Sequence, residues 1–475
     1  MTDFAETRKP ARHAATAEEG GSSEPVSPVT RELSEYVAGA LARPLPEAVA
    51  EKTRCHLLDT LAAMVSGSRL PPGRQALAYV RAQGGRRQST VVGSRCVTTA
   101  VNAALAGGMC AHADETDDSH IGGRFHPGCA VVPAALAAAE LADRDGASLL
   151  GAVALGYDLG ARFVMALGLS GAYRRPHSTH SLGGLFGAAA AAGALLGLDA
   201  RQFRFQLSYA VQQASGLAYW MRDPDHVEKA FDFGGMPARN AVAAATMAAA
   251  GFTGVEDPLA GPRNFLEAFA LAPRPEALIE GLGSRFEIMQ ASIKKWPAGA
   301  PIQAALDALE TLMRAHGIGA GDVARLTVRL PDDRAHLVDD RDVPNLCVQP
   351  LVAVLLRDGG LGFGAAHDRA RMRDPAILAL RERIRLVPDA ALTRALPPRQ
   401  AIVELETPDG RRLTQRTRAV RGTPDNPMAR AEVEAKALDL LAPVLGAKRA
   451  RALTSAILGI ERLASVRALR PLFQA

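Results

Sequence analysis

The sequence predicts a mainly α fold, with a large all-helical domain built from both chain ends and a smaller α+β domain. Of the 475 residues, 48% are hydrophobic and 22% are charged, which is the balance of an ordinary soluble globular protein. Alanine dominates the apolar residues and aromatic residues make up only 5%, so close packing through small side chains favours helices. Strand-like alternation of apolar and polar residues begins only after about residue 273. At roughly 100–200 residues per domain, the length indicates two or three domains.

The first half of the chain is expected to hold a tail and then the helical domain. Residues 1–28 are polar and rich in Gly, Ser, Pro and Glu, so we expect a disordered tail. From residue 29 to residue 271, apolar residues recur at helical spacing, as Leu58, Leu61 and Val65 do. Several Ala-rich segments are apolar nearly all round, which indicates helices buried on more than one side: 134–141, 188–196 and 240–250.

Residues 272–422 are expected to form the α+β domain. Residues 324–330 alternate apolar with polar side chains, and the turn Thr407-Pro-Asp-Gly between residues 401–406 and 411–418 is typical of a β-hairpin. Helical stretches lie between these strands, at 302–316, 348–357 and 377–383. Helical periodicity returns in residues 423–475, which are too few to stand alone, so we expect them to pack on the helical domain.

Charge and cysteine content argue against several classes of function. The formal net charge is +5, but the basic residues are scattered Arg rather than a block interleaved with aromatic residues, so nucleic-acid binding is not indicated. The five cysteines form no CxxC pair, which argues against a disulfide framework and a thiolate zinc site and favours a reducing compartment. We find no run of about 18 uninterrupted apolar residues and no secretory signal, so we expect a cytoplasmic protein that does not bind membranes.

The densest polar cluster runs from His112 to His126 and contains His112-Ala-Asp-Glu-Thr-Asp-Asp-Ser-His and His126-Pro-Gly. Imidazoles and carboxylates this close perturb one another's pKa values, as acid–base catalysis requires. The same side chains are suitable metal ligands, and Asp, Ser and Gly also cap helices and build turns. Catalysis, metal binding and capping all remain open from the cluster alone.

Three further stretches carry candidate polar groups. Arg174-Arg-Pro-His177-Ser-Thr-His180 precedes a helix, where an anion is favoured, although an ordinary helix cap explains it equally well. Lys229 stands in a loop before Gly-Gly-Met-Pro, and Lys294 and Lys295 stand beside a Trp-Pro turn. These lysines are either carboxylate-binding residues or solvated surface residues, Lys229 being the natural partner of the adjacent Glu228 in the second case.

Taken in order, these segments resemble the MmgE/PrpD family, which includes 2-methylcitrate dehydratase and cis-aconitate decarboxylase. Each match is short, but together they run in the family's order from about residue 29 to residue 472. The matching segments are His56-Leu-Leu-Asp-Thr-Leu-Ala, Asp117-Asp-Ser-His with His126-Pro-Gly, Phe186-Gly-Ala-Ala with Leu195-Leu-Gly-Leu-Asp, Lys229 with Gly-Gly-Met-Pro-Ala-Arg-Asn, Gly251-Phe-Thr-Gly, Lys294-Lys-Trp-Pro, and Gln349 with Asp358-Gly.

The resemblance implies two domains with a cleft between them, a homodimer, and chemistry that needs no cofactor or metal. It places Glu115 and Ser119 where the family has an acidic and a hydroxyl group, His126 where it has a catalytic His, and Lys229 and Lys294 where it has cleft lysines. One of His177 and His180 is expected to complete proton delivery, since an ungapped alignment puts Ser178 at the family's third His. Lys295 and Asp118 are further candidates for substrate binding.

Two other family positions differ here. The His that often follows the Lys-aromatic-Pro turn is absent from Ala298-Gly-Ala-Pro, and Pro350 stands where a Tyr commonly follows Gln349. Because Gly299 and Pro350 are smaller or less polar than the family's usual residues, we expect them to enlarge the pocket.

These observations predict a cofactor-independent lyase or isomerase that acts on a small di- or tricarboxylate by proton transfer next to a carboxylate. Dehydration, decarboxylation and epimerisation are all compatible with the residues. His126 is the first candidate for the general base or acid. Two alternatives stay open: a non-catalytic carboxylate-binding protein on the same scaffold, and a Mg²⁺-dependent helical diphosphate enzyme, for which Asp114-Glu-Thr-Asp-Asp is superficially suitable.

Overall fold

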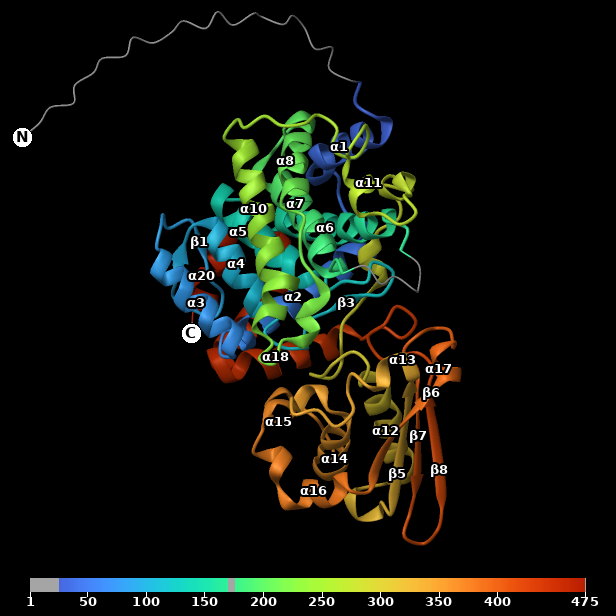
Figure 1. The fold of residues 1–475 in the computed structure, drawn as a ribbon. Coiled ribbons are helices and arrows are strands. Elements are labelled where there is room, and N and C mark those ends of the chain that lie inside the picture. The colour runs from blue at the N-terminus through green and yellow to red at the C-terminus, as the bar shows by residue number, and fades with distance from the viewer. Residues whose placement is uncertain (1–24, 170–175, 475) are drawn as a thin grey trace, which may run out of the picture.

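The computed structural model describes residues 25–169 and 176–474 and confirms the mainly α fold with a smaller sheet region (Figure 1). The predicted tail, residues 1–28, lies almost wholly outside the described residues, and the first helix begins at Pro28. Two separate hydrophobic cores form, one among the helices of both chain ends and one around the four-stranded sheet. The second core begins at Trp296, so the cores divide the chain near the Lys294-Lys-Trp-Pro segment.

The helical domain consists of eleven N-terminal helices and three helices that return from the C-terminal end, counted over the described residues. The N-terminal helices are α1 (Pro28–Gly39), α2 (Glu47–Gly67), α3 (Pro71–Gln83), α4 (Ala100–Ala111), α5 (Gly128–Ala142), α6 (Gly146–Ala166), α7 (Thr179–Leu196), α8 (Ala200–Gln212), α9 (Val227–Ala230), α10 (Met236–Ala249) and α11 (Phe265–Phe269). The returning helices are α18 (Arg430–Leu445), α19 (Ala447–Leu458) and α20 (Arg470–Phe473). In Figure 1, α18 lies along the edge of the helical domain that faces the sheet domain.

The α+β domain is built on a mixed sheet in the order β6-β5-β7-β8. Its strands are β5 (Arg325–Pro331), β6 (Ile384–Asp389), β7 (Ala401–Glu406) and β8 (Arg412–Thr417). The hairpin β7–β8 and the strand β5 occupy the predicted segments, whereas β6, which pairs parallel to β5, was not predicted. The helices of the α+β domain are α12 (Gln303–His316), α13 (Asp332–Ala335), α14 (Val348–Asp358), α15 (Phe363–His367), α16 (Pro375–Arg381) and α17 (Ala390–Thr393).

Shorter elements connect these parts. Two small antiparallel pairs form, β1 (Ser89–Thr90) with β2 (Val97–Thr98) and β3 (Ser119–His120) with β4 (Ala291–Ser292). A π-helical segment, η3 (Phe231–Gly235), joins α9 to α10. The 3-10 turns are η1 (Ala40–Ala42), η2 (Ala218–Arg222), η4 (Pro275–Leu278), η5 (Glu287–Gln290), η6 (Ala320–Asp322), η7 (Pro344–Leu346), η8 (Arg371–Arg373), η9 (Ile460–Arg462) and η10 (Val466–Leu469).

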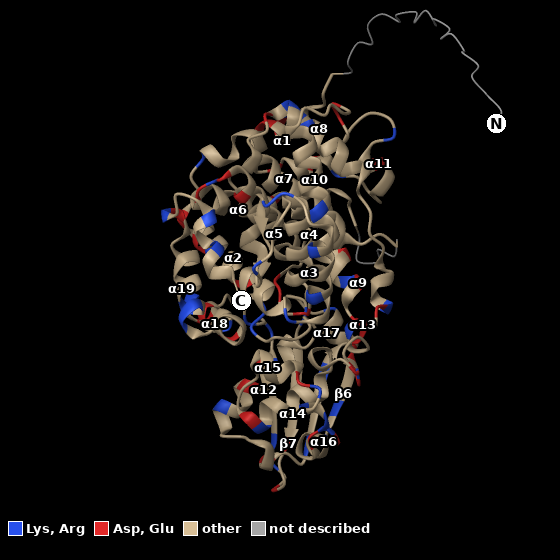
Figure 2. Ribbon diagram, turned by 90° about the vertical axis from the view of Figure 1, so that its left-hand side faces the viewer, with Lys and Arg blue, Asp and Glu red and all other residues tan. Residues whose placement is uncertain are grey.

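Glycine and alanine allow the central helices to approach closely, as the composition predicted. A Cβ atom added to Gly187 of α7 would lie 2.4 Å from the carbonyl oxygen of Gly156 in α6, so only glycine fits at this crossing. α6 and α7 are also long and apolar enough to cross a membrane, yet 89% and 83% of their apolar windows are buried inside the protein. Both are therefore core helices in this structure, and Figure 2 shows acidic and basic residues interspersed over the elements that surround them.

Candidate active site

The loop that joins α4 to α5 carries the polar cluster from His112 to His126. Thr99 caps α4 by accepting from the backbone N–H of Asn102, and the helix ends at Ala111, directly before the loop. Within the loop, β3 pairs with β4, so that Ser119 lies opposite Ser292. Because β4 leads into the α+β domain, this pairing brings the loop against the connection between the two domains.

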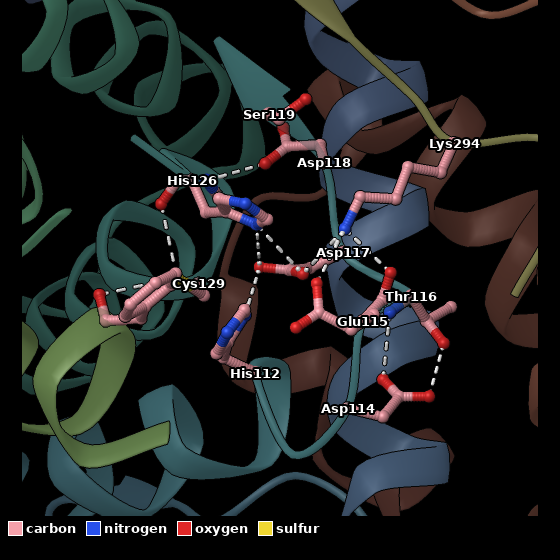
Figure 3. A network of polar contacts seen from close by, with 12 residues as sticks. His112, Asp114, Glu115, Thr116, Asp117, Asp118, Ser119, His126, Cys129 and Lys294 are labelled. Carbon is pink, nitrogen blue, oxygen red and sulfur yellow. Dashed lines mark hydrogen bonds and ion pairs between the residues drawn. The ribbon is translucent and has the colours of Figure 1, made fainter. Parts of the chain in front are cut away.

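Asp117 is at the centre of the cluster and is fully buried. Its carboxylate lies 2.9 Å from Nδ1 of His112, 3.1 Å from Nδ1 of His126 and 3.6 Å from Nζ of Lys294 (Figure 3). Burial on its own raises the pKa of Asp117, but the two imidazoles and the ammonium outweigh it and hold the pKa well below its usual range. Asp117 is therefore ionised at neutral pH.

His126 has the environment of a general base. Since an ionised carboxylate only accepts hydrogen bonds, Nδ1 of His126 donates to Asp117, and Nε2 carries the lone pair. Burial lowers the pKa of His126 to about 4, although Asp117 acts in the opposite direction, so the imidazole is neutral at pH 7. Its ring lies 5.3 Å from that of His180 and 5.4 Å from that of Phe233, measured between centroids. The lone pair is thus available to take a proton.

Glu115 lies beside two ammonium groups. It forms an ion pair with Lys229, and Nζ of Lys294 lies 2.7 Å from its backbone oxygen and 3.7 Å from its carboxylate. Burial raises the pKa of Glu115, but Lys229 and Lys294 outweigh it and hold the pKa well below its usual range. Nζ of Lys229 also lies 5.2 Å from the ring centroids of both Trp220 and Phe233. Each ammonium has three N–H donors, so both lysines can bind a further acceptor.

His180 and Ser119 complete the group of predicted residues that the fold brings together. The ring of His180 stacks on Phe233 at 3.7 Å between centroids, and its Nδ1 is buried without a hydrogen-bond partner. Burial holds the pKa of His180 well below its usual value. Ser119 is buried, and its Oγ accepts from Nη1 of Arg399 at 3.4 Å.

His177 and Lys295 lie away from this group. His177 precedes α7, its ring is 5.0 Å from that of Phe269, and its backbone forms a β-bridge with Leu217. Lys295 forms an ion pair with Glu310 in α12 and lies 4.4 Å from the ring centroid of Trp296. Of the arginines in the predicted anion-binding stretch, Arg174 and Arg175 lie outside the described residues.

Asp118 makes contacts that differ from those of its neighbour Asp117. Its Oδ2 lies 2.6 Å from both Nδ1 of His56 and the hydroxyl of Tyr157, and its Oδ1 accepts from the backbone N–H of Gly128 at 3.0 Å. The residue is fully buried. These contacts hold the start of α5 against α2 and α6, which is a positioning role rather than a free carboxylate facing a ligand.

Several residues of the site were not singled out from the sequence. Asp117 and His112 were part of the recognised cluster, but the spacing did not show that Asp117, rather than Asp118, bonds both imidazoles. His226 was overlooked beside Lys229, although its ring lies 5.1 Å from that of His112. Arg399, in the loop before β7, gave no sequence signal.

The structure contradicts the prediction that Gly299 enlarges the pocket. A Cβ atom on Gly299 would lie 2.7 Å from Cδ2 of Leu346, so a neighbouring side chain fills that space. Pro350 is buried in α14. The replacements therefore leave no open volume at Gly299 into which a larger substrate would extend.

Both halves of the chain match models of one protein family. The MmgE/PrpD N-terminal domain matches residues 31–277, and the MmgE/PrpD C-terminal domain matches residues 296–461. The chain belongs to the MmgE/PrpD family. The boundary between the two matches falls at the connection that carries Lys294 and Lys295, where the two hydrophobic cores also divide.

Two fungal members of the family are among the relatives of this MmgE/PrpD chain. The cis-aconitate decarboxylase-like protein oryM of Aspergillus oryzae is 28% identical over 313 residues, which cover 62% of this chain and 63% of the relative. The cis-aconitate decarboxylase of Aspergillus terreus is 25% identical over 302 residues, covering 61% of each chain. The similarity thus spans about three fifths of either relative.

Two groups of side chains in this MmgE/PrpD site have the donor chemistry of a metal site: His112 with Glu115 and His226, and His112 with Asp117 and His126. In each group the possible ligand atoms lie within 4.8 Å of one another. However, the carboxylate of Glu115 is paired with Lys229 and Lys294, and that of Asp117 lies beside Lys294. A divalent cation would therefore have to displace ammonium groups that already balance these charges.

Proposed function

We propose that this protein is a lyase of the dehydratase or decarboxylase type that acts on a small di- or tricarboxylate by proton transfer next to a carboxylate. The observation that carries the proposal is the buried Asp117–His126 pair, in which the imidazole is neutral and the carboxylate also lies 3.6 Å from the Lys294 ammonium. The names of the two fungal relatives support a carboxylate substrate.

Substrate binding begins with the ammonium groups of Lys229 and Lys294. Each retains N–H donors beyond its contact with Glu115, and each is largely shielded from water, with side chains 16% and 3% exposed. Ion pairing is stronger where water is excluded, so a carboxylate placed here would be held firmly. Glu115 keeps both ammonium groups charged and in position.

Proton transfer follows at His126. Its Nε2 takes a proton from the carbon next to the bound carboxylate, while Asp117 stabilises the imidazolium that forms. The negative charge that develops on the substrate carboxylate lies against the lysines, which lowers the barrier to its formation. The hydroxyl group on the adjacent carbon then leaves as water with the proton carried by the imidazolium of His126, which gives the dehydratase reaction.

In the decarboxylase reaction the electron pair comes from the breaking carbon–carbon bond instead. His126 or His180 then relays a proton from water to the resulting carbanion, since both imidazoles are neutral at pH 7 before the reaction. Return of the proton to the opposite face would give an epimerase. None of these steps uses a metal or an organic cofactor. We propose a cofactor-independent reaction because the ammonium groups of Lys229 and Lys294 already balance the carboxylates of Glu115 and Asp117. Homodimer formation and a cytoplasmic location remain predictions.

The test is a thermal-shift screen of the full chain against di- and tricarboxylates, including 2-methylcitrate and cis-aconitate, followed by proton NMR of each stabilising compound in D₂O. Every reaction is run with and without EDTA. We expect deuterium uptake or a new alkene signal that EDTA does not change. Stabilisation with an unchanged spectrum would instead establish a carboxylate-binding protein, and activity lost with EDTA would establish a metal-dependent enzyme.

A further inference from the structure

Within the described residues, no carboxylate lies within ion-pair distance of Arg399, in contrast to Lys229, Lys294 and Arg421. Lys229 and Lys294 share Glu115, Lys294 also lies beside Asp117, and Arg421 pairs with Glu432. Among the described residues, the only hydrogen bond of the Arg399 side chain is the one from Nη1 to Oγ of Ser119, at 3.4 Å. Arg399 is therefore the one uncompensated charge in this set.

The position of Arg399 is energetically unfavourable without a partner. Arg399 is half-buried, and this burial, together with the charge of Arg334, lowers its pKa to about 10, so the guanidinium is charged at neutral pH and partly removed from water. Its backbone also has φ of 69°, in the left-handed region that residues with a Cβ atom rarely adopt. Strained residues of this kind tend to occur where a ligand is bound.

Arg399 lines a narrow cavity between the two domains. The other polar residues in its lining include Ser119, Ser292 and Lys294. Ser292 is only 4% exposed, and its Oγ has no hydrogen-bond partner. The cavity measures about 20 Å³, which is the space that one water or one carboxylate oxygen requires. It adjoins a larger cavity of about 270 Å³.

Lys294 connects this cavity to the catalytic groups. Its side chain lines the cavity, while its Nζ lies 3.6 Å from Oδ1 of Asp117, which in turn bonds His126. Arg399, the two serines and Lys294 thus line one cavity, and Lys294 also lies beside Asp117, the hydrogen-bond partner of His126. This set of donors has the chemistry that binds a carboxylate, since arginine donates through parallel N–H groups and hydroxyls donate singly.

We propose that Arg399, Ser119 and Ser292 form a second carboxylate subsite, which makes the active site select substrates with two or more carboxylates over monocarboxylates. The inference rests on the proposed function for the identity of the first carboxylate position, at Lys229 and Lys294. It assigns Arg399 as a specificity-determining residue contributed by the α+β domain.

Calorimetric titration of the full chain with succinate and with butyrate tests the subsite, because the two ligands differ by one carboxylate. We expect wild type to bind succinate at least tenfold more tightly, the size of effect that one hydrogen-bonded ion pair gives. Arg399→Gln is expected to lose this preference. Ser292→Ala removes a hydroxyl with no partner in the structure, so it is expected to fold normally and to weaken succinate binding about threefold.

Arg334→Gln is the matched control. It also removes one positive charge close to Arg399, but the Arg334 side chain is half-exposed and does not line the cavity. Its succinate affinity is expected to stay within about twofold of wild type. The proposal is overturned if wild type shows no preference for succinate, if Arg399→Gln or Ser292→Ala binds succinate as wild type does, or if Arg334→Gln loses the preference equally.

This measurement separates the subsite from the proposed function because it requires no turnover. If the variants lose succinate affinity as expected but wild type never exchanges protons with any polycarboxylate, the subsite stands and the lyase proposal fails. If wild type turns over a polycarboxylate and Arg399→Gln leaves the binding preference intact, the lyase proposal stands and the subsite is wrong.

Discussion

Replacing Asp117 by asparagine tests how the site activates His126. The carboxylate accepts hydrogen bonds from Nδ1 of both His126 and His112 and neutralises part of the charge of Lys294. An asparagine of nearly the same shape keeps one acceptor oxygen, but it removes the negative charge. If that oxygen takes the place of Oδ2, which lies near both imidazoles, its NH₂ group replaces Oδ1 and faces the N–H donors of His126 and Lys294. In that orientation His126 must change its tautomer or rotate to avoid the donor–donor contact.

The expected loss follows from these contacts. If His126 presents the wrong tautomer and the imidazolium loses its negative partner, kcat should fall by about 10²- to 10⁴-fold, or roughly 3–5 kcal/mol of barrier. The buried network is also left with an unsatisfied group, which costs about 1–3 kcal/mol of folding stability. The variant should therefore remain folded at moderate temperature but be almost inactive.

The assay compares Asp117→Asn with Asp118→Asn, which is the same substitution at the adjacent and equally buried residue. Because Asp118 bonds His56, Tyr157 and the backbone N–H of Gly128, we expect its variant to lose comparable stability but to keep kcat within about threefold. Steady-state rates are measured on the substrate found by NMR, and circular dichroism and urea denaturation report the folded fraction of each variant.

Equal kcat values for wild type and Asp117→Asn would refute this assignment of Asp117. A larger loss of kcat in Asp118→Asn than in Asp117→Asn, at equal folded fraction, would show that Asp118 contacts the substrate, as the sequence comparison had led us to expect.

Three further predictions concern catalysis and stability. His126→Gln should lower turnover by at least about 10³-fold and leave the urea midpoint nearly unchanged, since the ring bonds only one carboxylate; a variant with near-normal turnover would exclude His126 as the base. Burial lowers the pKa of His367, but Asp114, 2.7 Å away, outweighs burial and raises the pKa. The ion pair between these two domains therefore contributes its full folding stability below about pH 6.5, the usual pKa of His. This contribution is lost as the pH rises through the raised pKa of His367. The stability difference between wild type and His367→Ala should therefore shrink as the pH rises above about 6.5, and a constant difference would contradict the pairing. Gly187→Ala should destabilise the fold by about 1–3 kcal/mol in urea denaturation, whereas Gly364→Ala, with open space around it, should change stability by less than about 1 kcal/mol; equal effects would contradict the close helix crossing.

Much of the fold could be predicted because its signals are local. The turn Thr407-Pro-Asp-Gly and the alternation around it gave the hairpin β7–β8, and alanine-rich segments gave the buried helices. The strand β6 was missed because its six residues include only two buried apolar side chains, Ile384 and Leu386. Its strand character depends on parallel pairing with β5, which lies more than 50 residues earlier.

The site was harder to predict because neighbouring residues point in different directions. Lys294 and Lys295 both follow β4, where successive side chains alternate, and only Lys294 contacts Glu115. Asp117 likewise bonds His126, whereas its neighbour Asp118 accepts from the backbone at the start of α5. A sequence shows that such residues are adjacent but not which of them faces the site.

Arg399 illustrates what no local pattern contains. It is separated from Ser119 by 280 positions, and the contact arises only because the α+β domain folds back onto the β3–β4 pair. Arg399 is of interest because it has no acidic partner among the described residues. That property depends on which side chains surround the guanidinium in three dimensions. Composition showed an excess of arginine but could not show which arginine is uncompensated.

Proton exchange at the carbon next to a carboxylate is the most direct measurement of the chemistry proposed for the Asp117–His126 pair. Wild type and His126→Gln are incubated in D₂O with cis-aconitate and with 2-methylcitrate in the presence of EDTA, and proton NMR follows the substrate signals. We expect deuterium incorporation or product formation with wild type on at least one of these acids and neither with His126→Gln. Exchange at equal rates in both proteins, or exchange in wild type only when a metal ion is restored, would contradict base catalysis by His126 without a cofactor.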